Sequence, residues 1–262
     1  MKYIACIEYD GTAYCGWQRL SHARSIQEEV EKALSSIANH PVEVTCAGRT
    51  DSGVHALGQI IHFETDAQRL LKAWVMGANT LLPDDISVIW AREAPTVKGE
   101  PFNARFSAYL RRYRYIILNR RARPGLLSHK VGWVYEPLDA DAMHLAAQTL
   151  LGEHDFSSFR ASGCQARHAI REVNSIQVTR DGDYLYVDIA ANAFLHHMVR
   201  NIVGSLIKIG KGDWPVAFMT ELLDLKDRTK AGPTAPASGL YFVHVHYPEE
   251  FDLPDEYRLP CF

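Results

Sequence analysis

The chain is poor in cysteine and contains no pair of cysteines with C-x-x-C spacing. Its five cysteines are scattered along 262 residues, a pattern that argues against a disulfide framework or a zinc site. No apolar run approaches the ~20 residues that span a membrane. Strand-like residues begin at the N-terminus, where a signal peptide would carry a charged segment and an apolar core. We therefore expect a cytoplasmic protein without a membrane anchor.

Acidic residues are absent from positions 101–130, although the net charge of the whole chain is −3. The basic residues of this window are Arg105, Arg111, Arg112, Arg114, Arg120, Arg121, Arg123 and Lys130. A segregated basic stretch with interleaved aromatic residues is typical of a surface that binds a phosphate backbone. A solvated face of an ordinary protein gives the same pattern, so the window alone decides nothing.

Hydrophobic periodicity predicts a repeated order of elements. The first half reads as strand, helix, strand, strand, helix, strand, with strands at 3–9, 42–46, 59–64 and 86–90. Its first helix is capped by Ser25 with Glu28, and its second covers about 70–78. The second half repeats the order from a strand at 107–118 to one at 240–247. It includes a helix that Asp139 caps and that runs through Leu151, and a hairpin that turns at Asp181-Gly182.

This repetition predicts an α+β protein of two ferredoxin-like β-α-β-β-α-β halves with antiparallel sheets. We expect an N-terminal domain at 1–105 and a C-terminal domain at 106–262. The tight Asp181-Gly182 turn occupies the place that a longer polar loop takes in the first half. Such an insertion into one copy of a repeated unit suits a functional site.

The inserted loop is the stretch Ala47–Ala56, which contains an arginine, a carboxylate, two glycines and a histidine. Polar loops between strands often carry chemistry, and Asp51 is the first candidate for a reacting group. Arg49 stands two residues away and would favour the ionised carboxylate. The alternative is that Asp51-Ser52-Gly53 is a plain turn.

The strand predicted at 107–118 places an arginine and tyrosines on one face by period-two alternation. The residues of that face are Tyr109, Arg111, Tyr113 and Tyr115. Such a face suits contact with phosphate and stacking on an unpaired base. The alternative is a hydrophobic strand whose arginines extend outward to solvent.

Three other signals do not support a function. The segment from Gly204 to Lys211 lacks the spacing of a phosphate-binding loop. His196-His197 and His244-x-His246 have no carboxylate or thiol spaced along the sequence to complete a tetrahedral site, and we expect no metal. An aspartic-protease turn at Asp51 would need a second carboxylate, which only a dimer could supply.

Separated motifs along the whole chain resemble those of the tRNA pseudouridine synthase I family. They are Glu8-Tyr9-Asp10-Gly11, Gly16-Trp17-Gln18, the stretch Ala47–Ala56, Asn103–Ala108, Arg111–Tyr115, Gly152-x-His154-Asp155-Phe156, Asn192–Asn201 and Gly239-Leu240-Tyr241. Ser52 stands where many members of the family carry alanine. Asn103 stands where others often carry a histidine-like residue, which leaves the contact made there open.

This resemblance implies a pseudouridine-synthase fold with a basic cleft, and a homodimer. The implied substrate is the anticodon stem-loop of tRNA, whose uridines 38, 39 and 40 become pseudouridine without a metal or cofactor. The implied site residues are Asp51 as nucleophile, Arg200 as its partner, Tyr113 and Leu240 against the target base, and Arg49, Arg105 and Arg111 as further substrate-binding residues.

Three other functions stay open at this point. A pseudouridine synthase with another RNA target would carry the same motif around Asp51. A non-catalytic RNA-binding protein would carry the same basic stretch. An aspartic hydrolase would use Asp51 in a different reaction, and inhibition by a pepstatin-like compound would reveal it.

Overall fold

The computed structural model describes residues 1–97 and 99–262. Its chain forms two compact units. The first comprises Met1–Tyr109 and Phe242–Leu259, and the second comprises Leu110–Tyr241 and Pro260–Phe262. The domains expected from element order, 1–105 and 106–262, differ from these units chiefly in the placement of Phe242–Leu259.

The first unit is built on a sheet with the strand order β4-β1-β3-β12, in which β2 also pairs with β3. Its strands are β1 (Lys2–Tyr9), β2 (Val44–Cys46), β3 (His55–Glu64), β4 (Ile86–Glu93) and the part of β12 (Leu240–His246) from Phe242 onward. Strand β1 pairs with β3 and β4, and β2 pairs with β3, all in antiparallel orientation. A short hairpin of β5 (Thr96–Val97) and β6 (Glu100–Pro101) follows β4.

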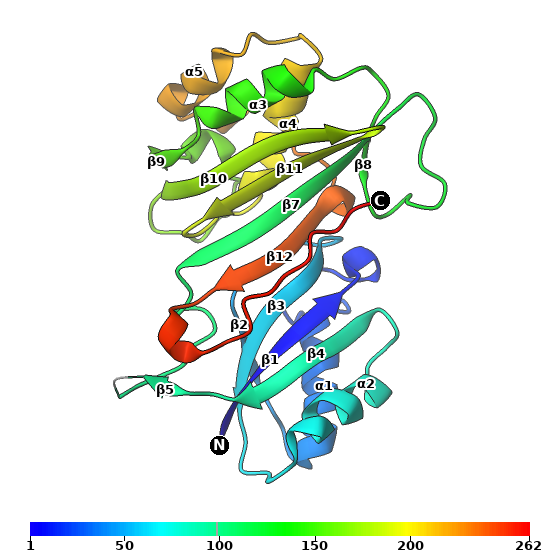
Figure 1. Ribbon diagram of the computed structural model, residues 1–262, viewed down its shortest axis with the longest axis vertical. Coiled ribbons are helices and arrows are strands. Elements are labelled where there is room, and N and C mark those ends of the chain that lie inside the picture. The colour runs from blue at the N-terminus through cyan, green and yellow to red at the C-terminus, as the bar shows by residue number, and fades with distance from the viewer. Residues whose placement is uncertain (98) are drawn as a thin grey trace. The chain divides into compact units, whose positions relative to one another are not determined.

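Helices α1 (Ile26–Ala38) and α2 (Ala78–Leu81) lie behind these strands in the view of Figure 1. The predicted cap of α1 is confirmed, because the Ser25 hydroxyl accepts a hydrogen bond from the Glu28 backbone N–H at 3.4 Å. A π-helical turn, Ala73–Gly77, leads into α2. It carries Trp74 into the core, where the indole lies 5.2 Å from the Phe63 ring.

The second unit has a sheet with the order β7-β11-β10-β9, and β8 runs parallel to β7. Its strands are β7 (Leu110–Asn119), β8 (Gly132–Val134), β9 (Gly152–Asp155), β10 (Ile170–Asp181) and β11 (Tyr184–Ala191). The predicted hairpin between β10 and β11 is confirmed. Gly182 adopts φ +54° in its turn, a conformation that glycine takes without steric cost.

Helices α3 (Ala140–Gln148), α4 (Met198–Gly210) and α5 (Phe218–Leu225) belong to this second unit. Helix α3 packs against β10 and α4. It begins as predicted at Asp139, whose carboxylate accepts the Ala142 N–H at 2.9 Å. The mixed α+β fold with largely antiparallel strands was therefore predicted correctly.

Several strands begin at other residues than expected, and two of these shifts concern the site. Strand β3 begins at His55 rather than Gln59, so the loop that carries Asp51 is shorter than predicted. Strand β7 begins at Leu110 rather than Ser107. Residues before it form a turn instead, in which the Ser107 N–H donates to the Asn103 carbonyl at 2.9 Å. Along the described residues, no helix is long and apolar enough to cross a membrane.

Candidate active site

The loop that carries Asp51 is fixed at its base by β3. The Gln59 side chain is fully buried and bonds both backbone groups of Gly48, accepting from its N–H at 3.3 Å and donating to its carbonyl at 2.5 Å. The Ala47 N–H donates to the Ile60 carbonyl at 2.8 Å. Strand pairing of β2 with β3 ends at Cys46. Beyond it, the Gln59 side chain supplies the hydrogen bonds that the Gly48 backbone needs.

Residues 9–17 hold the same loop from another side. The Tyr9 phenol and the Thr50 hydroxyl lie 2.7 Å apart, and the Trp17 N–H donates to the Thr50 carbonyl at 3.0 Å. The Ser52 hydroxyl donates to the Tyr14 carbonyl at 3.1 Å. Both backbone and side chain of Thr50 are therefore fixed immediately before Asp51.

Two glycines allow this close approach. A Cβ on Gly16 would lie 2.6 Å from the Thr50 carbonyl oxygen, and one on Gly11 would overlap the Val54 carbonyl. Gly16 also has φ +88°, which disfavours any side chain. Gly11 and Gly16 therefore allow residues 8–18 to pack directly against the backbone of the loop that carries Asp51. Their positions in the sequence do not reveal this role.

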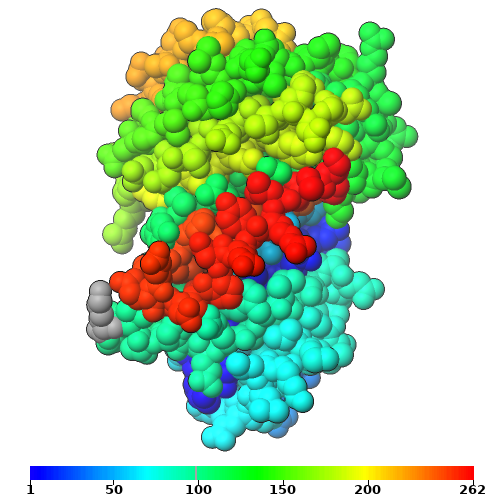
Figure 2. Space-filling model, viewed as in Figure 1, coloured from blue at the N-terminus to red at the C-terminus, as the bar shows by residue number. Residues whose placement is uncertain are grey.

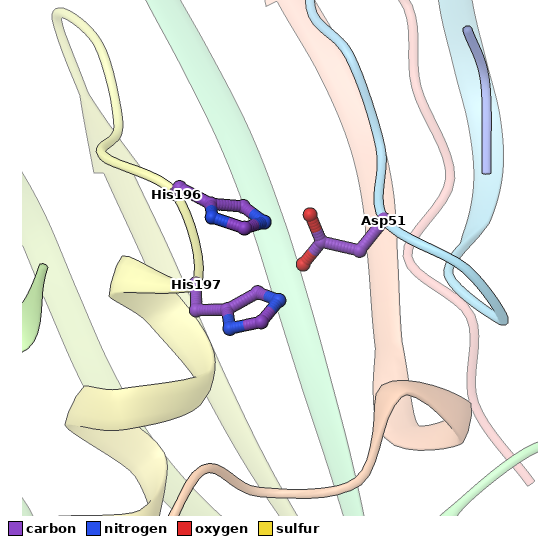
Figure 3. Close-up of side chains that lie close together, drawn as sticks. All are labelled: Asp51, His196 and His197. Atoms are coloured by element: carbon purple, nitrogen blue, oxygen red, sulfur yellow. The ribbon is translucent and has the colours of Figure 1, made fainter. Parts of the chain in front are cut away.

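Asp51 projects from this loop as a half-buried side chain (Figure 3). The turn closes behind it, where the Val54 N–H donates to the Asp51 carbonyl at 3.1 Å and Gly53 takes φ +76°. The plain-turn interpretation is thus correct for the backbone. It leaves the carboxylate itself presented on a rigid support.

The positive charges of Arg49 and Arg105 both act on the Cys46 thiol, immediately before this loop. Burial raises the pKa of the Cys46 thiol to about 11, and the positive charges of Arg49 and Arg105 oppose that rise. Arg49 is exposed, as a residue that contacts a ligand from solvent would be. The first unit thus gathers three of the predicted site residues around one loop.

In the second unit, Tyr113 and Arg111 both contact the segment that follows β11. The Tyr113 ring is buried and meets Phe194 edge to face, with 5.0 Å between ring centroids. Arg111 Nη1 donates to the Asn192 carbonyl at 2.8 Å. Phe194 is a contact of Tyr113 that the sequence analysis missed.

The predicted stacking face of β7 is only partly available. Tyr109 precedes the strand, and Tyr115 is completely buried with its phenol donating to the Pro236 carbonyl at 2.8 Å. On the opposite face, Arg114 forms a two-bond ion pair with Asp188, with both N–O distances 2.7 Å. Period-two alternation located the faces but could not show which side chains the second unit covers.

Arg200 is half-buried in α4 and is held by a reciprocal pair of hydrogen bonds. Its Nε donates to the Ala235 carbonyl at 2.8 Å, and the Ala235 N–H donates to the Arg200 carbonyl at 3.1 Å. One turn along the same helix, the Ser205 hydroxyl accepts the Gly232 N–H at 2.9 Å. The segment before β12 is thereby fastened to α4.

Leu240 begins β12 and is buried. Its neighbours are anchored on both sides, since the Ser238 hydroxyl donates to the Val131 carbonyl at 3.1 Å and the Tyr241 phenol donates to the Lys130 carbonyl at 2.6 Å. A Cβ on Gly239 would lie 2.6 Å from the Tyr115 ring. The backbone at Leu240 therefore has a fixed position in the second unit.

His196 and His197 immediately precede α4, and their ring centroids are 4.0 Å apart (Figure 3). His197 has φ +61°. The His196 N–H points at the Cys164 sulfur, 3.5 Å away. Burial raises the pKa of the Cys164 thiol, but hydrogen bonds from the His196 and Ala166 backbone and the charge of Arg160 reverse this, and the net pKa is lowered.

Comparisons with known proteins agree with one another. A family model described as tRNA pseudouridine synthase matches residues 5–107 and 146–248. A protein of Hydrogenovibrio crunogenus named tRNA pseudouridine synthase A is 59% identical over 248 residues, covering 95% of this chain and 93% of that protein. Its namesake in Escherichia fergusonii is 58% identical over 261 residues, covering 100% of this chain and 95% of that protein.

A chain from a solved Cbf5-Nop10-Gar1 complex is a weak structural match. It has a TM-score of 0.35 and 10% sequence identity, with 91% of this chain and 57% of that chain covered.

Proposed function

Since this chain belongs to the tRNA pseudouridine synthase family and is an isomerase that modifies tRNA, we propose that it converts uridines 38, 39 and 40 of the anticodon stem-loop, with Asp51 as nucleophile. The observation that carries the proposal is the support of Asp51. Its loop is bonded to β3 through Gln59 and to residues 9–17 through Thr50. Preorganisation of this kind is what a reacting carboxylate needs.

The reaction breaks the N1–C1′ bond of uridine and forms a C5–C1′ bond. The C5 proton is lost and N1 gains a proton, so the product is an isomer and no electron acceptor is required. The Asp51 carboxylate attacks at C1′ or at C6 of the ring and leaves again in the last step, which divides one difficult step into easier ones. The target base must first leave the stem, at a cost of roughly a few kcal/mol.

Three residues of the second unit are proposed to serve this chemistry. Arg200 would stabilise the ionised carboxylate of Asp51, as the family resemblance implies. Tyr113 and Leu240 would hold the flat base without directional hydrogen bonds, so that the free uracil can turn between bond breaking and rejoining. Tyr113 or a water molecule would take the C5 proton.

The basic side chains supply the proposed contact with the tRNA backbone. Arg49, Arg105 and Arg111 are the candidates, and each neutralised phosphate strengthens binding and its dependence on salt. A homodimer in the cytoplasm is the assembly that the family resemblance implies, and we retain it as part of the proposal.

The test is release of tritium from tRNA labelled at uracil C5. Wild-type enzyme is expected to release label, and Asp51→Asn is expected to release none above background while still binding tRNA. Ser52→Ala is the matched control, because it changes the neighbouring residue to one that many family members carry. Turnover by Asp51→Asn near the wild-type rate would overturn the role of Asp51.

The positions are tested separately by mapping pseudouridine in the product tRNA with a carbodiimide adduct and primer extension. Stops at 38, 39 or 40 that depend on Asp51 support the anticodon stem-loop. Stops found only at other positions would mean that the enzyme makes pseudouridine elsewhere in the tRNA, and would overturn the proposed target.

A further inference from the structure

Two histidines and a carboxylate of the first unit, none of them among the proposed site residues, lie close together. His244 and His246 lie two residues apart on β12 and so share one face of the strand. The Asp255 carboxylate oxygen Oδ1 lies 2.8 Å from His244 Nε2 and 2.9 Å from His246 Nδ1. One oxygen and two ring nitrogens of a single unit thus converge on one point.

The chain reaches this arrangement by turning back after β12. A single turn at Glu249–Phe251 reverses its direction, and Asp252 follows in a left-handed conformation with φ +47°. Asp252 is bonded to Arg92 of β4 through both its carbonyl and its carboxylate. The C-terminal segment, red in Figure 2, lies at the surface of the molecule.

Tyr257 covers the cluster from the side of this segment. Its ring stacks on His244 with 4.9 Å between centroids and an interplanar angle of 23°, and it meets His246 edge-on at 6.0 Å. His244 is buried and His246 half-buried, whereas Asp255 is exposed. The two imidazoles are therefore held within the unit, whereas the carboxylate lies at the surface, where an ion can reach it from solvent.

We propose that His244 Nε2, His246 Nδ1 and the Asp255 carboxylate bind a divalent transition metal, with Zn²⁺ as the ion that suits the donors. Zinc binds imidazole nitrogen and carboxylate oxygen at about 2.0–2.2 Å in a tetrahedron, so its ligand atoms lie about 3.3 Å apart. The two nitrogen–oxygen distances, 2.8 and 2.9 Å, need to lengthen by about 0.5 Å to admit the ion. Water takes the fourth position.

The chemistry of the donors selects the class of metal. Imidazole suits zinc, copper and nickel, whereas magnesium and calcium prefer oxygen ligands throughout. We expected no metal from the sequence because no carboxylate or thiol stands at a suitable spacing from the histidines. Asp255 comes close to them only because the chain turns back at Glu249–Phe251. The site is structural, because it joins the C-terminal segment to β12.

Without an ion, the same contacts are ordinary hydrogen bonds from two imidazoles to one carboxylate. The two states are distinguished by equilibrium dialysis of the untagged full-length chain against zinc at neutral pH, with bound metal measured by mass spectrometry. We expect one tightly held zinc per chain. Asp255→Asn is expected to weaken binding by at least about 100-fold, because loss of a direct ligand exceeds the 10- to 100-fold cost of losing an outer partner.

Glu256→Gln is the matched control, since it removes one negative charge from the adjacent residue and is expected to bind zinc like the wild type. Failure of wild-type enzyme to retain zinc, or equal retention by Asp255→Asn, would overturn the site.

A second measurement does not depend on any variant folding. Cobalt added to wild-type enzyme is expected to give the visible absorption of a tetrahedral nitrogen and oxygen site, and zinc is expected to remove it. Zinc is also expected to slow tryptic cleavage after Arg258 in wild-type and Glu256→Gln chains. An absorption spectrum of hydrated cobalt throughout the titration would contradict the proposal.

Discussion

The phenol oxygen of Tyr9 and the hydroxyl oxygen of Thr50 share a 2.7 Å hydrogen bond between two buried side chains. Burial raises the pKa of the Tyr9 phenol well above its ordinary value, so the group stays protonated throughout the physiological range. Thr50 immediately precedes Asp51. This bond therefore connects the first strand of the chain to the residue next to the proposed nucleophile.

Tyr9→Phe is expected to lower the free energy of unfolding by about 1–3 kcal/mol, because it leaves the buried Thr50 hydroxyl without this partner. Displacement of the Asp51 loop is expected to lower kcat by about 10- to 100-fold with little change in the Kd for tRNA. Tyr3→Phe is the control, since the hydroxyl of that buried tyrosine donates a long hydrogen bond to the Met1 sulfur, at 3.5 Å, a weak acceptor. An unchanged kcat in Tyr9→Phe would contradict the positioning role.

Gly16 and Gly99 form a matched pair for testing close packing around the Asp51 loop. Both have positive φ, +88° and +83°, but only Gly16 has an atom in the way of a Cβ, the Thr50 carbonyl oxygen at 2.6 Å. Alanine at either position should cost about 1–2 kcal/mol of backbone strain. Gly16→Ala should cost about 1–3 kcal/mol more from overpacking. Urea denaturation of the two variants measures the difference, and equal costs would refute the packing argument.

His62 should make the protein less stable in acid. Its Nδ1 accepts the Ala104 N–H at 3.0 Å, and burial, aided by the charge of Lys2, lowers the pKa of the imidazole from 6.5 to about 4. The unfolded chain therefore binds a proton that the folded chain does not between those values. Stability is fully present above pH 6.5 and is lost as the pH falls toward 4, by about 3 kcal/mol in total.

His62→Asn is the control for this pH dependence, because an asparagine oxygen can accept the Ala104 N–H but does not titrate. The free energy of unfolding, measured in urea across this pH range, should fall less steeply in the variant. Parallel curves for the two proteins would show that other groups cause the loss.

The ion pair of Arg114 with Asp188 should stabilise the second unit only while both partners are present. The guanidinium makes two 2.7 Å bonds to the carboxylate and lies 4.5 Å above the Tyr186 ring. Asp188→Leu should cost about 3–5 kcal/mol by leaving a largely buried charge uncompensated. The double variant Arg114→Met with Asp188→Leu should recover most of that loss. A double variant as unstable as the sum of both single variants would contradict this account.

Local signals in the sequence predicted the elements that local interactions determine. The Ser25 cap of α1, the Asp139 cap of α3 and the turn at Asp181-Gly182 each depend on a few adjacent residues, and all three are present. The motifs also identified the family before any fold was known. What these signals share is that the atoms responsible are close together along the chain.

Interactions between distant segments were not predictable in the same way. Nothing near Gln59 indicates that its amide bonds to Gly48, and alternation along β7 does not reveal that Tyr115 is covered. The meeting of Asp255 with His244 depends on how the chain turns after β12. Each case is decided by tertiary packing, which overrides or completes the local preference.

The order of synthesis has a consequence for the first unit. Strand β12 is the neighbour of β3, and the backbone of Gly58 lies close against the Val243 carbonyl, yet Leu110–Tyr241 is translated between them. At bacterial or eukaryotic elongation rates the ribosome needs on the order of 10 s for that stretch. During this time the edge of β3 lacks its final partner, and an open strand edge can pair with other chains. Nascent chains stalled near residue 241 should therefore be the ones that chaperones retain.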